Sequence, residues 1–311
     1  MPRRRAVLRG LLCHALPLTA NSLVMSLATL RDTVLISSRL QAAGFAPAAA
    51  DTLYSAYGNL AMPLYNLVPA LLAPVTVSLM PLLGAAVAKG SPSSGREALR
   101  AALRLTLLLT IPAALGLAVF AEPLLLLIFG TQSAVSVAAP LLSVLALSLL
   151  PVVLVLLFGA ALQAMGHTLL PVAAMALGAS VKLPAEAILL SLPAVHIYGA
   201  PISTLCCNLT ILGIEALALA KRLPFAIGTA RDLFLPLGAA VLAVGSGAAV
   251  YFWLLQRGCS GALALLPALP VVVVTYFLLA LRLGALTRAD LALLPFGTRL
   301  CALLEKCKML K

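Results

Sequence analysis

Long apolar runs, separated by short polar or basic segments, fill the chain between about residues 10 and 283. A helix that crosses a membrane needs about 20 apolar residues, each advancing it by about 1.5 Å. The runs are long enough, so the pattern predicts an all-α, polytopic membrane helix bundle with about eight transmembrane helices. The expected spans are about 11–37, 53–87, 98–121, 135–160, 168–190, 199–220, 233–255 and 261–281.

The second of these runs, about 53–87, is too long for one straight span and holds several prolines. Proline lacks a backbone N–H and its ring collides with the preceding turn, so this run is expected to kink or break. Its first part, YSAYGNLAMPLYN, is rich in small, polar and aromatic residues and is expected to face protein or water rather than lipid tails. Another apolar piece, LLLLIFG, follows Glu122 and Pro123 and is too short to cross a membrane.

Basic residues divide unequally when the eight spans are threaded alternately in and out. One side holds only Arg39 and Arg257. The other side receives 17 of the 21 Lys and Arg residues, namely Arg3, Arg4, Arg5, Arg9, Lys89, Arg96, Arg100, Arg104, Lys221, Arg222, Arg231, Arg282, Arg288, Arg299, Lys306, Lys308 and Lys311. Short loops with this bias are cytoplasmic, so both termini and Ser91 are expected inside and Arg257 outside.

Composition narrows the class of protein. A mean hydropathy of +1.13, 63% hydrophobic residues and only 10% charged residues exclude a soluble globular domain. The net charge of +12 does not point to nucleic acid, because the basic residues lie in loops and tail and aromatics are few. The six cysteines are scattered without a CxxC, the three histidines lack metal-site spacing, and no Walker-type loop occurs. The sequence therefore predicts no enzyme, no metal and no other cofactor.

Several segments, taken in order, carry a family resemblance. They are PLTANSLVMSLATLRDTVLISSRLQAAGF, YGNLAMPLYNLVPALLAPVTVSLMPLLGAA, LRLTLLLTIPAALGLAVFAEPLLLLIFG, LQAMGHTLLPVAAMALGASVKL, IYGAPISTLCCNL and LTRADLALLPFGTRL. Together they resemble the stage V sporulation protein B group of polysaccharide exporters. That group belongs to the multidrug/oligosaccharidyl-lipid/polysaccharide (MOP) superfamily, with the MurJ-type lipid II flippases and the MATE transporters.

The resemblance implies a two-bundle fold of about fourteen helices around a central cavity, of which this chain matches helices seven to fourteen. It divides the chain into a C-terminal six-helix bundle over 1–221, two additional transmembrane helices over 222–283 and a basic cytoplasmic tail over 284–311. The N-terminal bundle has no counterpart, so a separately encoded N-terminal bundle is an expected partner. The eighth helix also lacks the arginine of the MurJ-type proteins.

The function implied is a flippase or exporter in the bacterial cytoplasmic membrane. It would move lipid-linked oligosaccharide or polysaccharide precursors, and membrane lipid and lipid-linked saccharide would be its ligands. Two alternatives stay open: half of a MATE-like cation/drug antiporter, and a non-transporting fragment or scaffold. A lysine in the middle of a span disfavours cationic drugs, because like charges repel.

Charged residues inside spans are the first candidates for transport chemistry, because burying them in hydrocarbon costs roughly a few kcal/mol or more. Lys182 lies near the middle of the fifth span, and Glu186, four residues on, shares its helix face. The lysine could bind a substrate phosphate while Glu186 tunes it or couples an ion; alternatively, the pair only neutralises itself. Asp32, beside Arg31 near the end of the first span, could line the cavity or reach interfacial water.

Glu215 lies in the inner half of the sixth span and is interpreted as a structural partner of an inner-loop arginine, with ion coupling as the alternative. Asn59, Asn66 and Asn208, with Asn21, could line a cavity or form hydrogen bonds between helices. The prolines of the second run could mark a bending helix for alternating access, or only static kinks.

Overall fold

The computed structural model describes residues 33–89, 92–130, 133–192, 195–222 and 230–283, and these ranges contain helices and no strands. A helical segment over 33–42 comes first. The elements that follow are α2 (Pro47–Ser55), η1 (Ala56–Ala61), α3 (Met62–Ala88), α4 (Pro92–Val119), α5 (Ala121–Phe129), α6 (Ser133–Ala146), α7 (Leu149–Ala164), α8 (Leu169–Ser191), η2 (His196–Tyr198), α9 (Gly199–Arg222), α10 (Ala230–Gln256) and α11 (Gly261–Arg282). The predicted all-α, polytopic membrane bundle is confirmed.

The described residues contain six helices long and apolar enough to cross a membrane, or seven if the bent pair α6–α7 counts as one span. Each matches one of the last seven predicted spans to within a few residues. Most of the first predicted span lies outside the described residues. The piece LLLLIFG, predicted to be too short to cross, lies mostly in the nine-residue α5. Many large apolar side chains point outward, Leu169 with 80% exposure among them, as expected where lipid replaces water.

The second predicted span is one continuous helical run through α2, η1 and α3. Its irregularity lies in η1, a π-helical turn in which the N–H of Met62 bonds the carbonyl of Tyr57. Pro63 follows directly and has no N–H for the carbonyl of Asn59, so a widened turn is a natural way to seat its ring. Of the two expected outcomes, a kink or a break, the break does not occur, and Pro69, Pro74 and Pro81 lie inside α3.

The break occurs instead in the fourth predicted span, where α6 and α7 meet at an angle of 47°. Pro151, in the first turn of α7, cannot donate to the carbonyl of Leu147, and its ring excludes that carbonyl from the helical position. The hydroxyl of Ser148 lies 2.8 Å from the carbonyl oxygen of Leu145 and takes part in the junction. The predicted span over 135–160 is therefore present as a bent pair of helices, and the bend was not predicted from the sequence.

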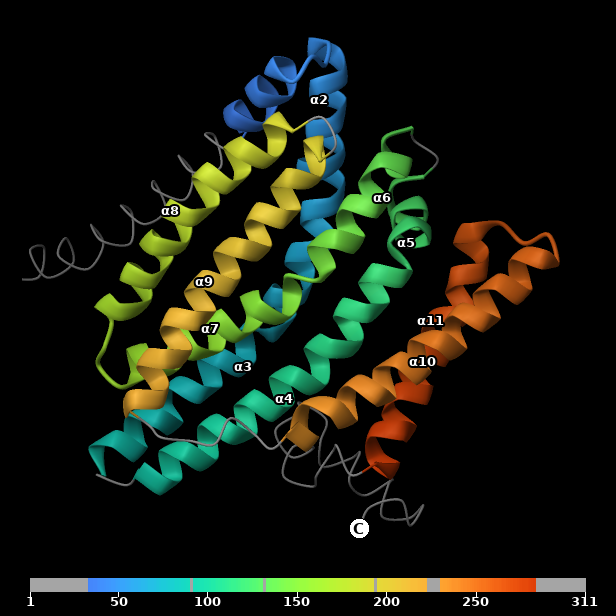
Figure 1. Ribbon diagram of the computed structural model, residues 1–311. Coiled ribbons are helices and arrows are strands. Elements are labelled where there is room, and N and C mark those ends of the chain that lie inside the picture. The colour runs from blue at the N-terminus through green and yellow to red at the C-terminus, as the bar shows by residue number, and fades with distance from the viewer. Residues whose placement is uncertain (1–32, 90–91, 131–132, 193–194, 223–229, 284–311) are drawn as a thin grey trace, which may run out of the picture.

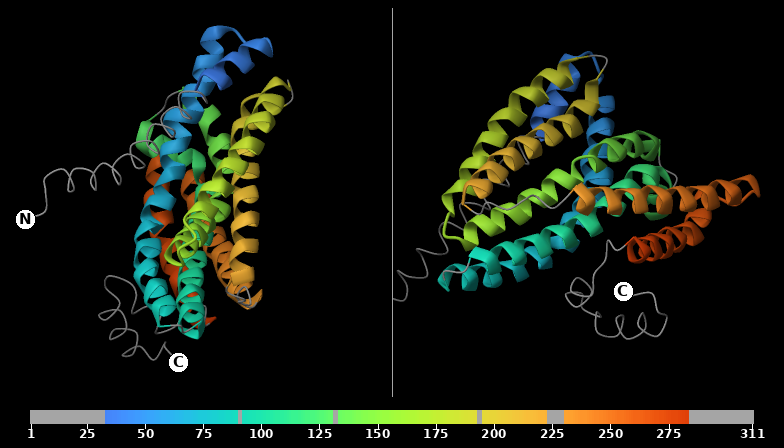
Figure 2. Two further views of the ribbon diagram at one scale, coloured as in Figure 1. Left: turned by 90° about the vertical axis from the view of Figure 1, so that its left-hand side faces the viewer. Right: turned by 60° about the horizontal axis from the view of Figure 1, so that its bottom comes forward.

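Helix packing places two hairpins on opposite sides of the molecule. Helices α8 and α9 pack along each other, and so do α10 and α11. Figures 1 and 2 show α4 and α7 between the two hairpins. Helix α9 packs against α7, whereas α10 packs against α4 and α11 against α5. The pair α10–α11 matches the predicted spans 233–255 and 261–281.

Glycine allows both hairpins to close tightly. A methyl group at Gly178 of α8 would collide with the side chain of Ile211 and lie 3.2 Å from the carbonyl oxygen of Cys207. A methyl group at Gly247 of α10 would collide with Val272 and lie 3.2 Å from the carbonyl oxygen of Ala268. Small residues at such crossings let backbones approach, which is how membrane helices gain packing energy without a hydrophobic effect between them.

Candidate functional site

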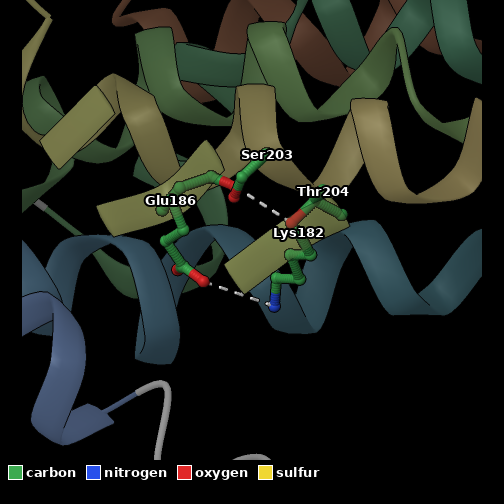
Figure 3. A network of polar contacts seen from close by, with 5 residues as sticks. Lys182, Glu186, Ser203 and Thr204 are labelled. Atoms are coloured by element: carbon green, nitrogen blue, oxygen red, sulfur yellow. Dashed lines mark hydrogen bonds and ion pairs between the residues drawn. The ribbon is translucent and has the colours of Figure 1, made fainter. Parts of the chain in front are cut away.

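An ion pair lies near the middle of α8. The ammonium Nζ of Lys182 is 3.9 Å from Oε2 of Glu186, and the Lys182 side chain is 21% exposed whereas that of Glu186 is 1% exposed. The i,i+4 spacing predicted that the two share a face, and the structure confirms their contact (Figure 3). Lys182 is nine residues from the end of α8, or about 14 Å at the helical rise. A cation is thus held deep within an apolar helix, with part of its surface open.

The facing helix α9 brings hydroxyl groups to the same region. Ser203 and Thr204 lie across from the ion pair (Figure 3). Their hydroxyls donate to the carbonyl oxygen of Ala200 at 2.9 and 3.0 Å, so each proton is used within α9 while the oxygen lone pairs remain. Gly199 starts the helix close to α8: a methyl group there would lie 2.8 Å from Cβ of Leu189. The tight turn holds α9 against the charged part of α8.

A second polar cluster joins three helices at the bend between α6 and α7. The hydroxyls of Tyr65 on α3 and Ser148 lie 3.1 Å apart, and Nδ2 of Asn208 on α9 donates to the Tyr65 hydroxyl at 3.5 Å. All three residues are buried. The interhelical reading of Asn208 is confirmed. Tyr65 and Ser148 were missed, because only their meeting in space, 83 residues apart, makes them a site.

The remaining sequence candidates are scattered. Asn59 is exposed and donates to the hydroxyl of Ser55 at 3.2 Å within its own helical run. Asn66, on α3, is also exposed. Asp32 lies outside the described residues. A role for these three in a cavity stays a prediction.

Glu215 on α9 is buried among apolar groups. Its side chain is 1% exposed, and no residue in the described ranges gives its Oε2 a hydrogen bond. A methyl group at Gly159 of α7 would lie 3.3 Å from Oε1 of Glu215. The nearest arginine along α9, Arg222, donates to the carbonyl oxygen of Ala218 at 3.1 Å. Within the described residues, the predicted contact between Glu215 and an arginine is therefore not found. The loop 223–229 lies outside these residues.

An apolar cleft of about 440 Å³ opens between α4, α5 and α11. Its walls are almost entirely leucine, valine, phenylalanine and small side chains, with Tyr276 the one lining residue that carries a side-chain polar group. That hydroxyl donates to the carbonyl oxygen of Leu108 at 2.6 Å, so its proton is not available to a ligand in the cleft. The sequence did not predict this cleft. Hydropathy describes each helix by itself, whereas a cleft depends on how several helices pack.

Metal binding needs several oxygen, nitrogen or sulfur ligands converging on one point. Over the part of the chain that the structure describes, no group of three or more His, Cys, Asp and Glu side chains could hold a metal ion. The chemistry that the site offers is therefore binding by one cation, its carboxylate partner and nearby hydroxyl oxygens.

Comparison with known proteins agrees with this picture. The sequence model of the family described as "Lipid II flippase MurJ" matches residues 2–268, which is most of the chain. The search of curated proteins found no match. Residues 2–268 include the ion pair on α8, the polar cluster at the α6–α7 bend, Glu215, all of α10 and the start of α11. The chain therefore belongs to the MurJ lipid II flippase family, whose members are membrane transporters rather than catalysts of a chemical reaction.

Proposed function

We propose that this protein moves a lipid-linked oligosaccharide or polysaccharide precursor across the bacterial cytoplasmic membrane. The single observation that carries the proposal is Lys182, a partly open cation within an apolar helix of a flippase-family protein. An ionisable residue inside a membrane span is costly. Where one occurs, it pairs with another group or marks a substrate or ion pathway. The stage V sporulation protein B-like resemblance favours a saccharide of the polysaccharide-precursor type.

Lys182 is the group that recognises the substrate phosphate. Glu186 holds the ammonium in the absence of substrate, at a separation of 3.9 Å that leaves room for a competing anion. A phosphate or pyrophosphate that approaches the exposed side of Lys182 gains a charge-assisted hydrogen bond. Asn59, Asn66 and Asp32 remain candidates for contacts to the saccharide headgroup.

The apolar cleft between α4, α5 and α11 accommodates the lipid part of the substrate. A volume of about 440 Å³ is in the usual range for a ligand pocket, and an isoprenoid chain needs apolar walls without hydrogen-bonding groups. Headgroup and tail then contact opposite sides of the molecule, since the α8–α9 and α10–α11 hairpins flank α4 and α7 (Figure 1).

Transport requires a second bundle beside this one. In the two-bundle arrangement that the resemblance implies, each bundle supplies one wall of the cavity. The boundaries expected from the resemblance, 1–221 for the six-helix bundle, 222–283 for the two additional helices and 284–311 for the tail, belong to the same proposal. Both termini face the cytoplasm, with Ser93 inside and Ser260 outside. In a cysteine-free background, an impermeant thiol reagent added to intact cells should label S260C and not S93C; the reverse would overturn this orientation.

The test of function is a headgroup-accessibility assay with a fluorescent polyprenyl-pyrophosphate saccharide in lipid vesicles, with and without a co-expressed N-terminal bundle. Lys182→Met should lower the translocation rate about tenfold or more, because a hydrogen bond to a charged group contributes about 1.5–3 kcal/mol. The matched control is Lys221→Met, which removes an exposed cation at the end of α9. Equal rates for the two variants would exclude Lys182 from substrate binding. Robust translocation by this chain alone would contradict the need for a second bundle.

A further inference from the structure

Glu215 has no role in the proposed substrate contacts, and its surroundings are unusual for a carboxyl group. Its residue surface is 1% exposed, and Oε2 has no hydrogen-bond partner among the described residues. The carboxyl packs on the bare backbone of Gly159, and Cβ of Pro171 would lie 3.8 Å from a methyl group placed there. One turn along α9, Leu219 is fully buried. The site is a buried niche between α7, α8 and α9.

Charged groups that could neutralise Glu215 are remote or absent in the helices packed against it. Helix α9 packs against α6, α7, α8 and η2. Helices α6 and α7 contain no titratable side chain. Helix α8 contributes Lys182 and Glu186, which lie beyond the level of the Gly178 contact with Ile211 and thus more than two turns from Glu215. Lys221 and Arg222 end α9, about 10 Å from Glu215 along the axis. His196 and Tyr198 belong to η2, which lies at the other end of α9. The cysteines Cys206 and Cys207 are two turns away.

An ionised carboxylate in such a niche would cost many kcal/mol, and in proteins such a group binds a proton instead. A metal cation needs several oxygen ligands, and the described residues bring no group of three or more His, Cys, Asp and Glu side chains together there. We infer that Glu215 is a proton-binding site whose occupancy is linked to the packing of α7 against α9. The carboxylate takes up one proton as the niche closes, and the carboxylic acid returns that proton to water as the niche opens.

The fold provides a short path from Glu215 to the surface and a bend at which α7 can move relative to α9. Gln163 lies one turn beyond Gly159 on the same face of α7 and is exposed, so the surface of the molecule is about 6 Å further along the axis. The bend of 47° between α6 and α7 divides the span 11 residues before Gly159. A change at this bend would shift α7 relative to α9 and expose the carboxyl. Protonation then favours the closed arrangement, and ionisation favours the open one.

The first test is the infrared spectrum of the full chain in lipid vesicles at neutral pH, read in the region of the protonated carboxyl stretch. Glu215→Gln should remove one such band. The matched control Glu122→Gln alters an exposed glutamate on α5 and should leave the band in place. A spectrum that Glu215→Gln does not change would overturn the proposal. If that variant fails to fold, Glu215→Asp keeps the acid but moves it away from Gly159, and the band should shift; an unshifted band would overturn the proposal equally.

The second test measures the linkage. Amide hydrogen exchange in α7 and α9 is compared between wild type and Glu215→Gln, from mildly acidic to alkaline buffer. Protection should fall in the wild type relative to the variant as the pH rises, because only the wild type can ionise. Equal responses of the two proteins would show that the proton is not coupled to helix packing. Both readouts are independent of lipid transport, so they stand or fall separately from the proposed function.

Discussion

Two buried glutamates lie on neighbouring helices and are stabilised in different ways. Glu186 on α8 and Glu215 on α9 are each 1% exposed. Glu186 has the ammonium of Lys182 at 3.9 Å, and Lys182 reaches the surface. Oε1 of Glu215 lies against the backbone of Gly159, and Oε2 has no hydrogen-bond partner among the described residues. Equal burial thus occurs in two settings: Glu186 has a cation beside it, whereas Glu215, on our inference, holds a proton.

The difference teaches where a transporter can bind charge. A cation with a partly exposed surface can exchange its carboxylate for a substrate phosphate, since the total charge near it changes little. A carboxyl without a partner can exchange only a proton. On these two proposals, the α8–α9 pair offers one site for an anion, at Lys182, and one for a proton, at Glu215. The following variants test this contrast.

Loss of the cation should have the largest effect. Lys182→Met leaves Glu186 without its counter-ion, and breaking a buried ion pair costs about 3–5 kcal/mol. Because Lys182 is 21% exposed and water partly replaces it, we expect about 2–3 kcal/mol lower unfolding free energy in detergent. The double variant Lys182→Met/Glu186→Gln should recover part of this loss. A double-mutant cycle measures the coupling, and additive single effects would contradict the pairing.

The packing that holds both glutamates should respond nearly as strongly. Gly178→Ala forces a methyl group into Ile211, and overpacking of this kind costs about 1–3 kcal/mol. Gly213→Ala on α9 is the matched control, because nothing lies within 4 Å of a methyl group there. The control should be neutral or slightly stabilising, since alanine favours a helix by up to about 1 kcal/mol over glycine. Thermal unfolding of the two variants in the same detergent decides the point.

Much of the fold could be read from the sequence, because lipid makes the requirement for a span simple. The apolar runs located the ends of α8, α9, α10 and α11 to within a few residues, and the i,i+4 rule placed Lys182 beside Glu186. Both are local properties of one helix. Proline was less informative: the interior of α3 contains three prolines without a break, while Pro151 accompanies a bend of 47°. The outcome depends on packing around each ring.

Properties of the site that involve two or more helices could not be predicted. Glu215 was expected to pair with an inner-loop arginine, whereas no described residue gives its Oε2 a hydrogen bond. The cleft between α4 and α11 and the contact between Tyr65 and Ser148 join positions far apart in the chain. Hydropathy assigns a helix to the membrane but does not say which neighbour a given face will meet.

The polar cluster at the α6–α7 bend should contribute less than the ion pair. Tyr65→Phe removes the hydroxyl that lies 3.1 Å from Ser148 and accepts from Asn208. We expect a loss of about 1 kcal/mol in unfolding free energy, the usual net value of a neutral hydrogen bond. The matched control is Tyr198→Phe on η2. Thermal unfolding in detergent, without denaturant, compares the two variants. A loss as large as that of Lys182→Met would mean that neutral and charged contacts contribute equally here, and the contrast between the two regions would weaken.

The smallest effect is expected at Glu215, although it is as buried as Glu186. If Glu215 is a neutral acid, Glu215→Gln exchanges one neutral group for another of the same shape, and the unfolding free energy at neutral pH should stay within about 1 kcal/mol of wild type. Glu186→Gln should cost more than Glu215→Gln, because it leaves the Lys182 ammonium without its partner. Unfolding of both variants, measured side by side at one pH, gives the order directly. A larger loss for Glu215→Gln than for Glu186→Gln would mean that Glu215 is an ionised, paired carboxylate, and the two halves of the α8–α9 pair would then bind charge in the same way.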